Sequence, residues 1–406
     1  ARLVKSDTFC MIPWIHMHAF PDGKVYPCCL SDMKYSIGDL KKNSMAEVWN
    51  SPGFKQLRTN MLAEKPSASC GRCYEQESAG FYSMRNSSNR NFGQHISLVD
   101  QTLADGTQED FKLRYYDIRF SNLCNFSCRT CGPIFSSNWY RDAKKLNMSI
   151  SHPQIMYPGR NDDDMWVQML EHIPYLEQIY FAGGEPLIMK EHWAILDELV
   201  KRKMFHVRLI YNTNFSETKF KGRDVFEMWK QFESVSVGAS LDDSYERGEY
   251  IRKGTVWSEI VENRKRMLEI CPRVDFYVSS TLSIMNSWHL PEFHREWVEL
   301  GLIRPGDWNV NILQDPEYFR IDALPADFKE LITARYEEHI SWLAPQDPMD
   351  RATQGFKSAI NFMTAQDQSS RMPEFLKQTA SLDSVRNEDF ATVFPEFAEW
   401  FNGIRS

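Results

Sequence analysis

The feature that most restricts the fold of this 406-residue chain is the uneven placement of its nine cysteines. Cys124, Cys128 and Cys131 fall within eight positions, and Cys271 stands alone. The other five all precede residue 80: Cys10, Cys28, Cys29, Cys70 and Cys73. In a reducing compartment, clustered thiols bind metal or do redox chemistry more often than they form disulfides. The sequence therefore predicts two metal centres, one in the N-terminal region and one after residue 120.

Composition narrows the class of protein. Apolar residues make up 42% and charged residues 25%, as in ordinary globular proteins. A formal net charge of −8 argues against a nucleic-acid partner, because phosphate contacts need a basic footprint. No apolar run approaches the length of a membrane span, and prolines and histidines interrupt the first twenty residues where a signal peptide would lie. We expect a cytoplasmic protein with no nucleic-acid and no membrane partner.

Strand-like and helical patterns alternate after residue 110. Six strand-like runs, LRYYDIRFS, LEQIYFAGG, FHVRLIYNTN, ESVSVGASLD, VDFYVSSTLS and DWNVNIL, are separated by helical patterns such as KEHWAILDELVKRK and VWSEIVENRKRMLEI. This order predicts an α/β fold, a partial (β/α)6 TIM-like barrel over residues 112–320, with its chemistry at the C-terminal strand ends. Residues 1–80 are expected to form a small cysteine-rich module, 81–111 a linker, and 321–406 a helical C-terminal extension.

The cysteine triplet follows the first of these strands with the spacing C-x3-C-x2-C. Three thiolates can hold three irons of a [4Fe–4S] cluster and leave the fourth iron open to a ligand with an amine and a carboxylate. On the residues alone, two other interpretations stay open. The triplet could be a zinc knuckle that lacks its fourth ligand, or three buried thiols.

Further motifs stand at the ends of the next three strands: FAGGEP, NTN and SLD. Together with the triplet, they resemble the radical S-adenosylmethionine (radical SAM) superfamily. The resemblance implies a SAM-binding [4Fe–4S] cluster on Cys124, Cys128 and Cys131. It also implies that SAM is bound by Gly183, Gly184, Glu185, Pro186, Asn214, Ser240 and Asp242. The activity implied is reductive cleavage of SAM to a 5′-deoxyadenosyl radical, which abstracts hydrogen from a substrate.

The N-terminal pattern C…DGKVYPCC…IGDL…SMAEVWNS…CGRC resembles the auxiliary iron–sulfur modules called SPASM and twitch. Five cysteines suffice for one auxiliary [4Fe–4S] cluster, and neighbours in an extended segment point to opposite faces. The resemblance, through the G-x4-C spacing from Gly23, selects Cys28 over Cys29, with Cys10, Cys70 and Cys73 as the other ligands. Ligand chemistry by itself leaves a zinc site with four thiolates open.

These motifs predict a radical SAM enzyme, of oxidoreductase type, that acts on a small molecule or a short peptide. The auxiliary cluster is expected to help an oxidative step, and a one-electron donor such as flavodoxin or ferredoxin is expected to reduce the protein. The small molecule is slightly favoured, because the cysteine module takes most of the roughly 110 residues before the barrel and leaves little room for a leader-binding domain. The alternatives are a peptide- or protein-modifying maturase and, in another class, a non-catalytic metal-stapled binding or electron-transfer protein.

Overall fold

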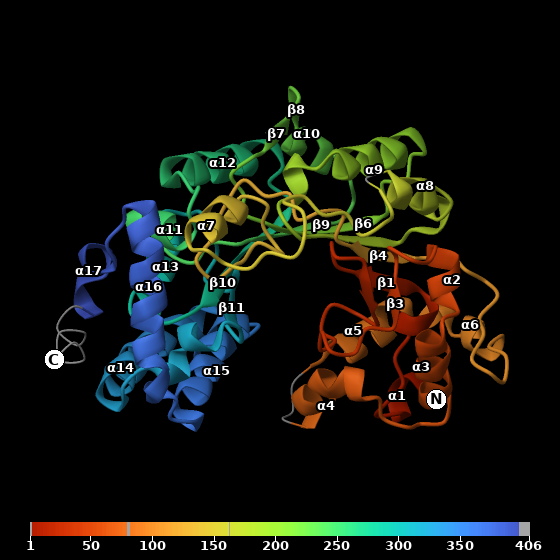
Figure 1. Ribbon diagram of the computed structural model, residues 1–406, viewed down its shortest axis with the longest axis horizontal. Helices are drawn as coiled ribbons and strands as arrows, with labels where there is room; N and C mark the ends of the chain where they lie inside the picture. Colours follow the sequence, from red (N-terminus) through yellow and green to blue (C-terminus); the bar gives the residue numbers. More distant parts are fainter. Residues whose placement is uncertain (1, 79–81, 162, 398–406) are drawn as a thin grey trace. The chain divides into compact units, whose positions relative to one another are not determined.

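The computed structural model describes residues 2–78, 82–161 and 163–397 (Figure 1). Its Cα atoms form two compact units. Unit 1 comprises Ala1–Asn122, Ile155–Ile210 and Phe232–Ser234, and unit 2 comprises Leu123–Gln154, Tyr211–Gln231 and Val235–Ser406. Residues 1, 79–81 and 398–406, which fall in the ranges expected for the module, the linker and the extension, lie outside the described residues.

The sheet of unit 1 joins the cysteine-rich region to the first α/β strands. Its order is β3-β2-β1-β4-β5. The strands are β1 (His16–Ala19), β2 (Lys24–Tyr26), β3 (Gly38–Asp39), β4 (Tyr115–Ile118) and β5 (Gln178–Phe181). β1 and β2 form an antiparallel hairpin, while β1 also runs parallel to β4, with His16 opposite Tyr115. The N-terminal region is therefore continuous with the α/β sheet, because β1 satisfies backbone groups that β4 would otherwise expose at an edge.

The helices of unit 1 differ from expectation in residues 81–111. That segment, expected as a linker, contains α5 (Met84–Phe92), η3 (Gly93–His95) and α6 (Ser97–Asp100). Phe92, Leu98 and Val99 pack with Phe9 and Trp14 in one apolar core, so the segment covers the module. The remaining helices of unit 1 are α1 (Arg2–Lys5), η1 (Ile12–Trp14), α2 (Met45–Trp49), α3 (Pro52–Leu62), η2 (Ala68–Cys70), α4 (Gly71–Ser78), α8 (Asp164–Leu170), η4 (Ile173–Tyr175), η5 (Pro186–Ile188) and α9 (Lys190–Lys201).

Unit 2 contains the later strands. β9 (Val235–Ala239), β10 (Asp275–Leu282) and β11 (Trp308–Ile312) are parallel neighbours, and β7 (Lys219–Phe220) pairs with β8 (Arg223–Asp224). β6 (Arg208–Thr213) contributes its first three residues to unit 1 and its last three to unit 2. All six expected strands form, and the two quoted helical patterns become α9 and α12 (Trp257–Ile270). The α/β fold class is confirmed.

The other helices of unit 2 stand before, between and after these strands in the sequence, and those after β11 form the C-terminal region. They are α7 (Trp139–Lys145), α10 (Val225–Trp229), α11 (Tyr245–Ile251), α13 (Leu290–Glu299), η6 (Glu317–Phe319), η7 (Ile321–Ala323), α14 (Ala326–Leu343), η8 (Ala344–Gln346), α15 (Arg351–Ala365), η9 (Ser369–Arg371), α16 (Met372–Arg386), α17 (Phe390–Val393) and η10 (Pro395–Phe397). α15 approaches β11 closely, because a Cβ at Gly355 would lie 3.0 Å from the Val310 side chain. Across the described residues, no helix combines the length and apolarity needed to span a membrane.

Candidate metal centres

The loop that carries the cysteine triplet is held by a backbone pairing in unit 2. The Ser127 N–H donates to the carbonyl oxygen of Lys253 over 2.8 Å, and the Arg129 N–H donates to that of Ile251 over 2.8 Å. Gly254, at φ +114°, allows this approach, since a Cβ there would lie 2.7 Å from the Phe126 ring. The loop is therefore fixed by a segment more than a hundred residues away in the sequence.

The thiols of the triplet have the chemistry of metal ligands. The Phe126 N–H donates to Cys124 Sγ at 3.4 Å, and Trp139 Nε1 donates to the Cys128 carbonyl oxygen at 2.6 Å. Burial raises the pKa of Cys128, and it raises the pKa of Cys131 to about 12. Because buried thiolates are unfavourable without a cation, a bound metal would supply the charge that keeps these sulfurs deprotonated. The residues present fit an iron–sulfur cluster, whose irons prefer thiolate ligands.

One strand-end residue of the SLD motif reaches the cysteines through an arginine. Asp242, in the loop after β9, binds Arg252 with both oxygens: Oδ1 lies 2.9 Å from Nη2, and Oδ2 lies 2.8 Å from Nε. Burial is the larger influence on Cys128 and Cys131, but the positive charge of Arg252 acts against it and lowers the pKa of both thiols. Arg252 thus links the Asp242 carboxylate to two of the three cysteines. Sequence reasoning missed it, because it lies ten residues from Asp242 and no local spacing singles it out.

The NTN motif also meets the cysteine loop within unit 2. Asn214 Nδ2 donates to Asn125 Oδ1 at 2.8 Å, and the Asn125 Nδ2 donates to Ser216 Oγ at 2.9 Å. Ser240, half-buried, donates its N–H to the Thr213 carbonyl oxygen at 2.8 Å. Asn214 and Asp242 are therefore close to the cysteine loop in the same unit, while the roles of Asn214, Ser240 and Asp242 toward SAM stay predictions.

The GGEP motif lies in unit 1: Gly183, Gly184 and Glu185 follow β5, and Pro186 begins η5. Gly183 has φ +98°, and a Cβ there would lie 3.0 Å from the Arg119 side chain, so glycine is required for two reasons. Glu185 is fully buried, and its side chain accepts the Leu187 N–H at 3.1 Å as the cap of η5. The binding of SAM by these four residues stays a prediction.

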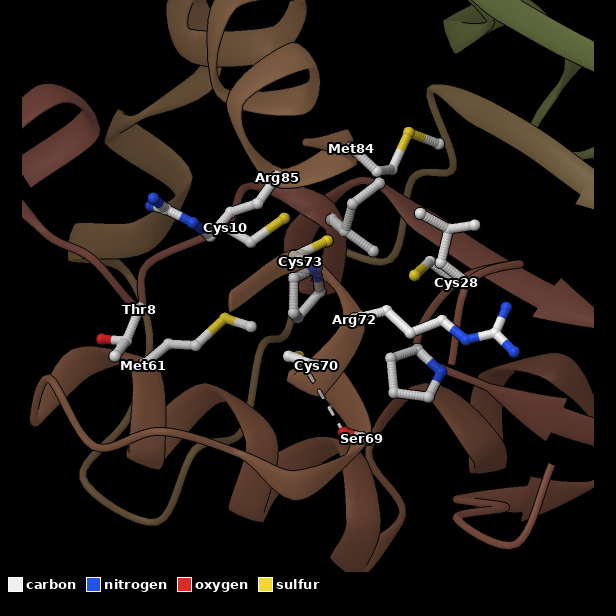
Figure 2. A pocket seen from close by; sticks show the side chains of 14 residues that line it. Thr8, Cys10, Cys28, Met61, Ser69, Cys70, Arg72, Cys73, Met84 and Arg85 are labelled. Carbon is white, nitrogen blue, oxygen red and sulfur yellow. Dashed lines mark hydrogen bonds between the residues drawn. The ribbon is translucent and has the colours of Figure 1, made fainter. Parts of the chain in front are cut away.

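Four of the five N-terminal cysteines line one cavity in unit 1 (Figure 2). Cys10 precedes η1, Cys28 follows β2, Cys70 ends η2 and Cys73 lies in α4. Figure 2 shows the sulfurs of Cys10 and Cys73 directed into the space between the four side chains. Cys10 belongs to the core of the unit, and Cys28 and Cys70 pack against that core. The hairpin, the short helices and the core thus bring together thiols that are far apart in the sequence.

The lining of the N-terminal cavity fits an iron–sulfur cluster held by thiolates. Burial raises the pKa values of Cys10, Cys28 and Cys70, so a bound metal would supply the charge that favours their thiolates. No carboxylate and no histidine lines the cavity. In the described part of the chain, no three His, Cys, Asp or Glu side chains are grouped as the ligands of one metal ion would be. Four sulfurs around zinc would be separated by only about 3.8 Å, given Zn–S bonds of about 2.3 Å. Thiolates on a cubane lie farther apart, because the irons and sulfides are between them.

A buried ion pair fixes the segment that precedes Cys10. The Arg85 side chain is 7% exposed and pairs with Glu77. Its Nη1 donates to the carbonyl oxygens of Ser6 and Phe9 at 2.7 and 3.1 Å. Because both carbonyls belong to the segment that enters the cavity, Arg85 positions the backbone of Cys10.

Cys29 is directed to a different environment. It does not line the cavity; instead burial, and then the negative charge of Asp117, raise its pKa well above the usual value. Asp117 is ion-paired with Arg119 (Nη2–Oδ1 3.0 Å), and His18 Nδ1 lies 3.1 Å from Asp117 Oδ2. The adjacent cysteines therefore separate, although they lie in a turn, where the Ser31 N–H donates to the Cys28 carbonyl oxygen at 3.1 Å, and not in the extended segment that the sequence predicts. The ligand role of Cys28 stays a prediction.

The arrangement of thiols has a counterpart in a known family. Residues 10–74 match the SPASM family, an iron–sulfur cluster-binding domain. This match confirms the expected SPASM-type auxiliary module. The SPASM segment ends one residue after Cys73 and so contains all five N-terminal cysteines.

Solved structures resemble the chain more distantly. Native anSMEcpe with bound AdoMet is 15% identical, with a TM-score of 0.34 over 55% of this chain and 60% of that one. SuiB of Streptococcus suis bound to precursor peptide SuiA is 13% identical, with a TM-score of 0.39 over 71% of this chain and 63% of that one. This chain spans about three fifths of the length of these proteins. No curated protein sequence matches it.

Proposed function

We propose that the chain is a radical SAM enzyme whose SPASM segment holds an auxiliary [4Fe–4S] cluster. One observation carries the proposal: in unit 2, the strand-end carboxylate of Asp242 holds Arg252 in a two-point ion pair, and the residues on either side of Arg252 accept backbone hydrogen bonds from the cysteine loop. An arginine that follows α11 and is held by a strand-end carboxylate beside the cysteine loop is placed to meet a carboxylate ligand near the cysteines. The SPASM match supplies independent support for iron–sulfur chemistry.

The residues of the chain have separate tasks in this proposal. When bound, the loop cluster would supply the electron that cleaves SAM to methionine and a 5′-deoxyadenosyl radical. Cys124, Cys128 and Cys131 would hold that cluster, and Cys10, Cys28, Cys70 and Cys73 would hold the auxiliary one. Asp242 orients Arg252 through its two-point ion pair, and Asn214 braces the cysteine loop through Asn125. Gly183 and Gly184 would let the backbone approach the methionine part of SAM, with Glu185 near its amine.

The substrate we propose is a small molecule or a short peptide, oxidised with the help of the auxiliary cluster. A one-electron donor such as flavodoxin or ferredoxin would reduce the protein. The titles of two solved structures name peptides bound to those proteins, SuiA to SuiB and Cp18Cys to anSMEcpe, so peptides belong in any substrate screen.

The test is anaerobic reconstitution with iron and sulfide, followed by reduction in the presence of SAM. We expect about eight irons per chain, four for each cubane, and release of 5′-deoxyadenosine that rises when a substrate pool is added. Pools of metabolites and of peptides, assayed separately, distinguish the two substrate classes. A colourless zinc protein, or a protein with eight irons that never cleaves SAM, would overturn the proposal and favour a metal-stapled binding or electron-transfer protein.

A further inference from the structure

The last turn of α16 contacts the cysteine loop directly. Arg386, whose side chain is 2% exposed, donates from Nη2 to the Ser127 carbonyl oxygen at 2.6 Å. The same guanidinium binds Asp142 of α7, with Nε and Nη2 lying 3.0 and 2.9 Å from Oδ2. Arg386 thus joins the residue before Cys128 to the helix that follows the loop.

A second buried arginine binds the loop to the same region from the other direction. Arg129, which follows Cys128, forms ion pairs through Nη2 with Asp383 of α16 and with Glu388. Its guanidinium carbon lies 3.5 Å from the centre of the Tyr250 ring, and the Tyr250 hydroxyl donates to Asp383 Oδ1 at 2.7 Å. Arg129 and Arg386 lie 257 positions apart in the sequence. Both are held by their ion-pair partners next to Cys128.

Apolar side chains also pack between α16 and α7, next to the cysteine loop. Leu382 is buried with Trp139 and Ala143 of α7, and Val385 and Cys131 pack against them. α16 therefore packs beside the third cysteine and also binds the backbone at Ser127.

The position of Arg386 also gives it an electrostatic effect. Its guanidinium lies beside the residue before Cys128, because Nη2 is 2.6 Å from the Ser127 carbonyl oxygen. Charges interact strongly when they are shielded from water, and a cluster becomes more negative when it gains an electron. A nearby cation therefore favours reduction, and hydrogen bonds and charge around the sulfurs set the potential of a cluster.

We propose that Arg386 is a positioning residue for the loop cluster, which both holds the Ser127 backbone and raises the reduction potential of that cluster. The proposal rests on the proposed function only in assigning an iron–sulfur cluster to the loop. Asp142 should make the change in reduction potential larger. Without Arg386, its buried carboxylate would be an uncompensated negative charge beside the loop.

The experiment uses the full chain, reconstituted anaerobically, in four variants. Arg386→Lys keeps the charge, Arg386→Gln removes it, and Arg386→Gln combined with Asp142→Asn removes the charge of both partners. Arg371→Gln, in the exposed ion pair with Glu317 just before α16, is the matched control. Redox titrations followed by electron paramagnetic resonance measure both clusters, and the auxiliary cluster serves as the internal reference.

The expected result is a more negative potential of the loop cluster in Arg386→Gln, with the auxiliary cluster unchanged. Arg386→Lys and Arg371→Gln should stay near wild type. In the double variant, the potential of the loop cluster should return most of the way to the wild-type value. A purely structural role cannot explain such a return, because the double variant has lost more contacts than Arg386→Gln. If Arg386→Gln loads only about four irons while Arg386→Lys loads about eight, the positioning role is supported.

Three results would overturn the inference. They are an unchanged loop potential in Arg386→Gln, an equal shift in both clusters, and a shift or iron loss in Arg386→Lys as large as in Arg386→Gln. The proposed function fails separately: if wild type loads both clusters but never cleaves SAM, while Arg386→Gln still shifts the loop potential, then only the radical SAM assignment is wrong.

Discussion

The two cysteine sites of this protein are built in opposite ways. The loop site takes three thiols from eight consecutive positions, whereas the N-terminal site collects four thiols from three separated segments. The compact loop nevertheless depends on distant residues, namely Arg252, Lys253 and Arg386. The dispersed site lies within one apolar core that includes Cys10. Cysteines that are close in sequence therefore still need distant residues to hold their loop. Cysteines that are far apart in sequence can be held together by one core.

The largest expected effect is on chemistry at the loop site. Cys128→Ala should abolish 5′-deoxyadenosine formation and lower iron from about eight to about four per chain, because a SAM-binding cubane needs all three thiolates. The unit should remain folded, since its strands and helices do not depend on this side chain. Liquid chromatography of the reaction and iron analysis measure both quantities.

Cys271→Ala is the matched control for that prediction. Cys271 caps the end of α12, and burial raises its pKa to about 12. Its replacement should leave SAM cleavage and iron content at wild-type levels. Appreciable cleavage in Cys128→Ala would contradict the assignment of the loop cluster.

The second effect combines iron loss with loss of stability. Cys10→Ala should remove about four irons per chain and also destabilise unit 1, because a cluster embedded in a core contributes to folding when it binds. Cys29→Ala, next to a cavity cysteine but outside the cavity, should leave the iron content unchanged. Iron analysis and thermal unfolding test this; loss of iron in Cys29→Ala, with none in Cys28→Ala, would reverse the assignment.

A third difference concerns pH in the metal-free protein. Burial raises the pKa of Cys28 above its unfolded value of about 9. A raised pKa means that the folded state favours the neutral thiol. This stability is complete below pH 9 and is lost as pH rises toward the folded pKa. Between pH 7 and 10, the free energy of unfolding of the metal-free wild type should fall more than that of Cys28→Ala, as measured by urea titration. Equal slopes for the two proteins would contradict the burial of this thiol.

The smallest effect tests the local support of the N-terminal site. Ser51 caps α3, accepting the Phe54 N–H and donating to the Ile37 carbonyl oxygen at 2.8 Å. Because α3 supplies Met61 to the cavity, Ser51→Ala should lower the stability of unit 1 by about 1 kcal/mol. The half-buried Ser381, inside α16, donates its hydroxyl only to the Lys377 carbonyl oxygen of its own helix, so Ser381→Ala should change stability by less than about 0.5 kcal/mol. Chemical denaturation compares the two, and a larger effect of Ser381→Ala would contradict the capping role.

The sequence by itself determined the local features. The capping box of Ser44 and Glu47, the cap at Ser51 and the β1–β2 hairpin each depend on residues within a few positions of one another. Alternation in an extended segment predicted that Cys28 and Cys29 would separate, although they do so in a turn. The six strands followed from short apolar runs bounded by turns, which fixed the α/β class but not the partners of the strands.

Only the tertiary structure decided which remote segments meet. The parallel pairing of β1 with β4 joins the cysteine module to the α/β sheet, although nearly a hundred residues separate His16 from Tyr115. Residues 84–100 look like a polar connection in sequence, yet Phe92 and Leu98 are drawn into the core because the module has too little apolar surface of its own. Arg252 and Arg386 carry no local pattern at all. Their effects arise because burial beside the cysteine loop removes the water that would otherwise screen their charges, and burial of that kind exists only in the folded chain.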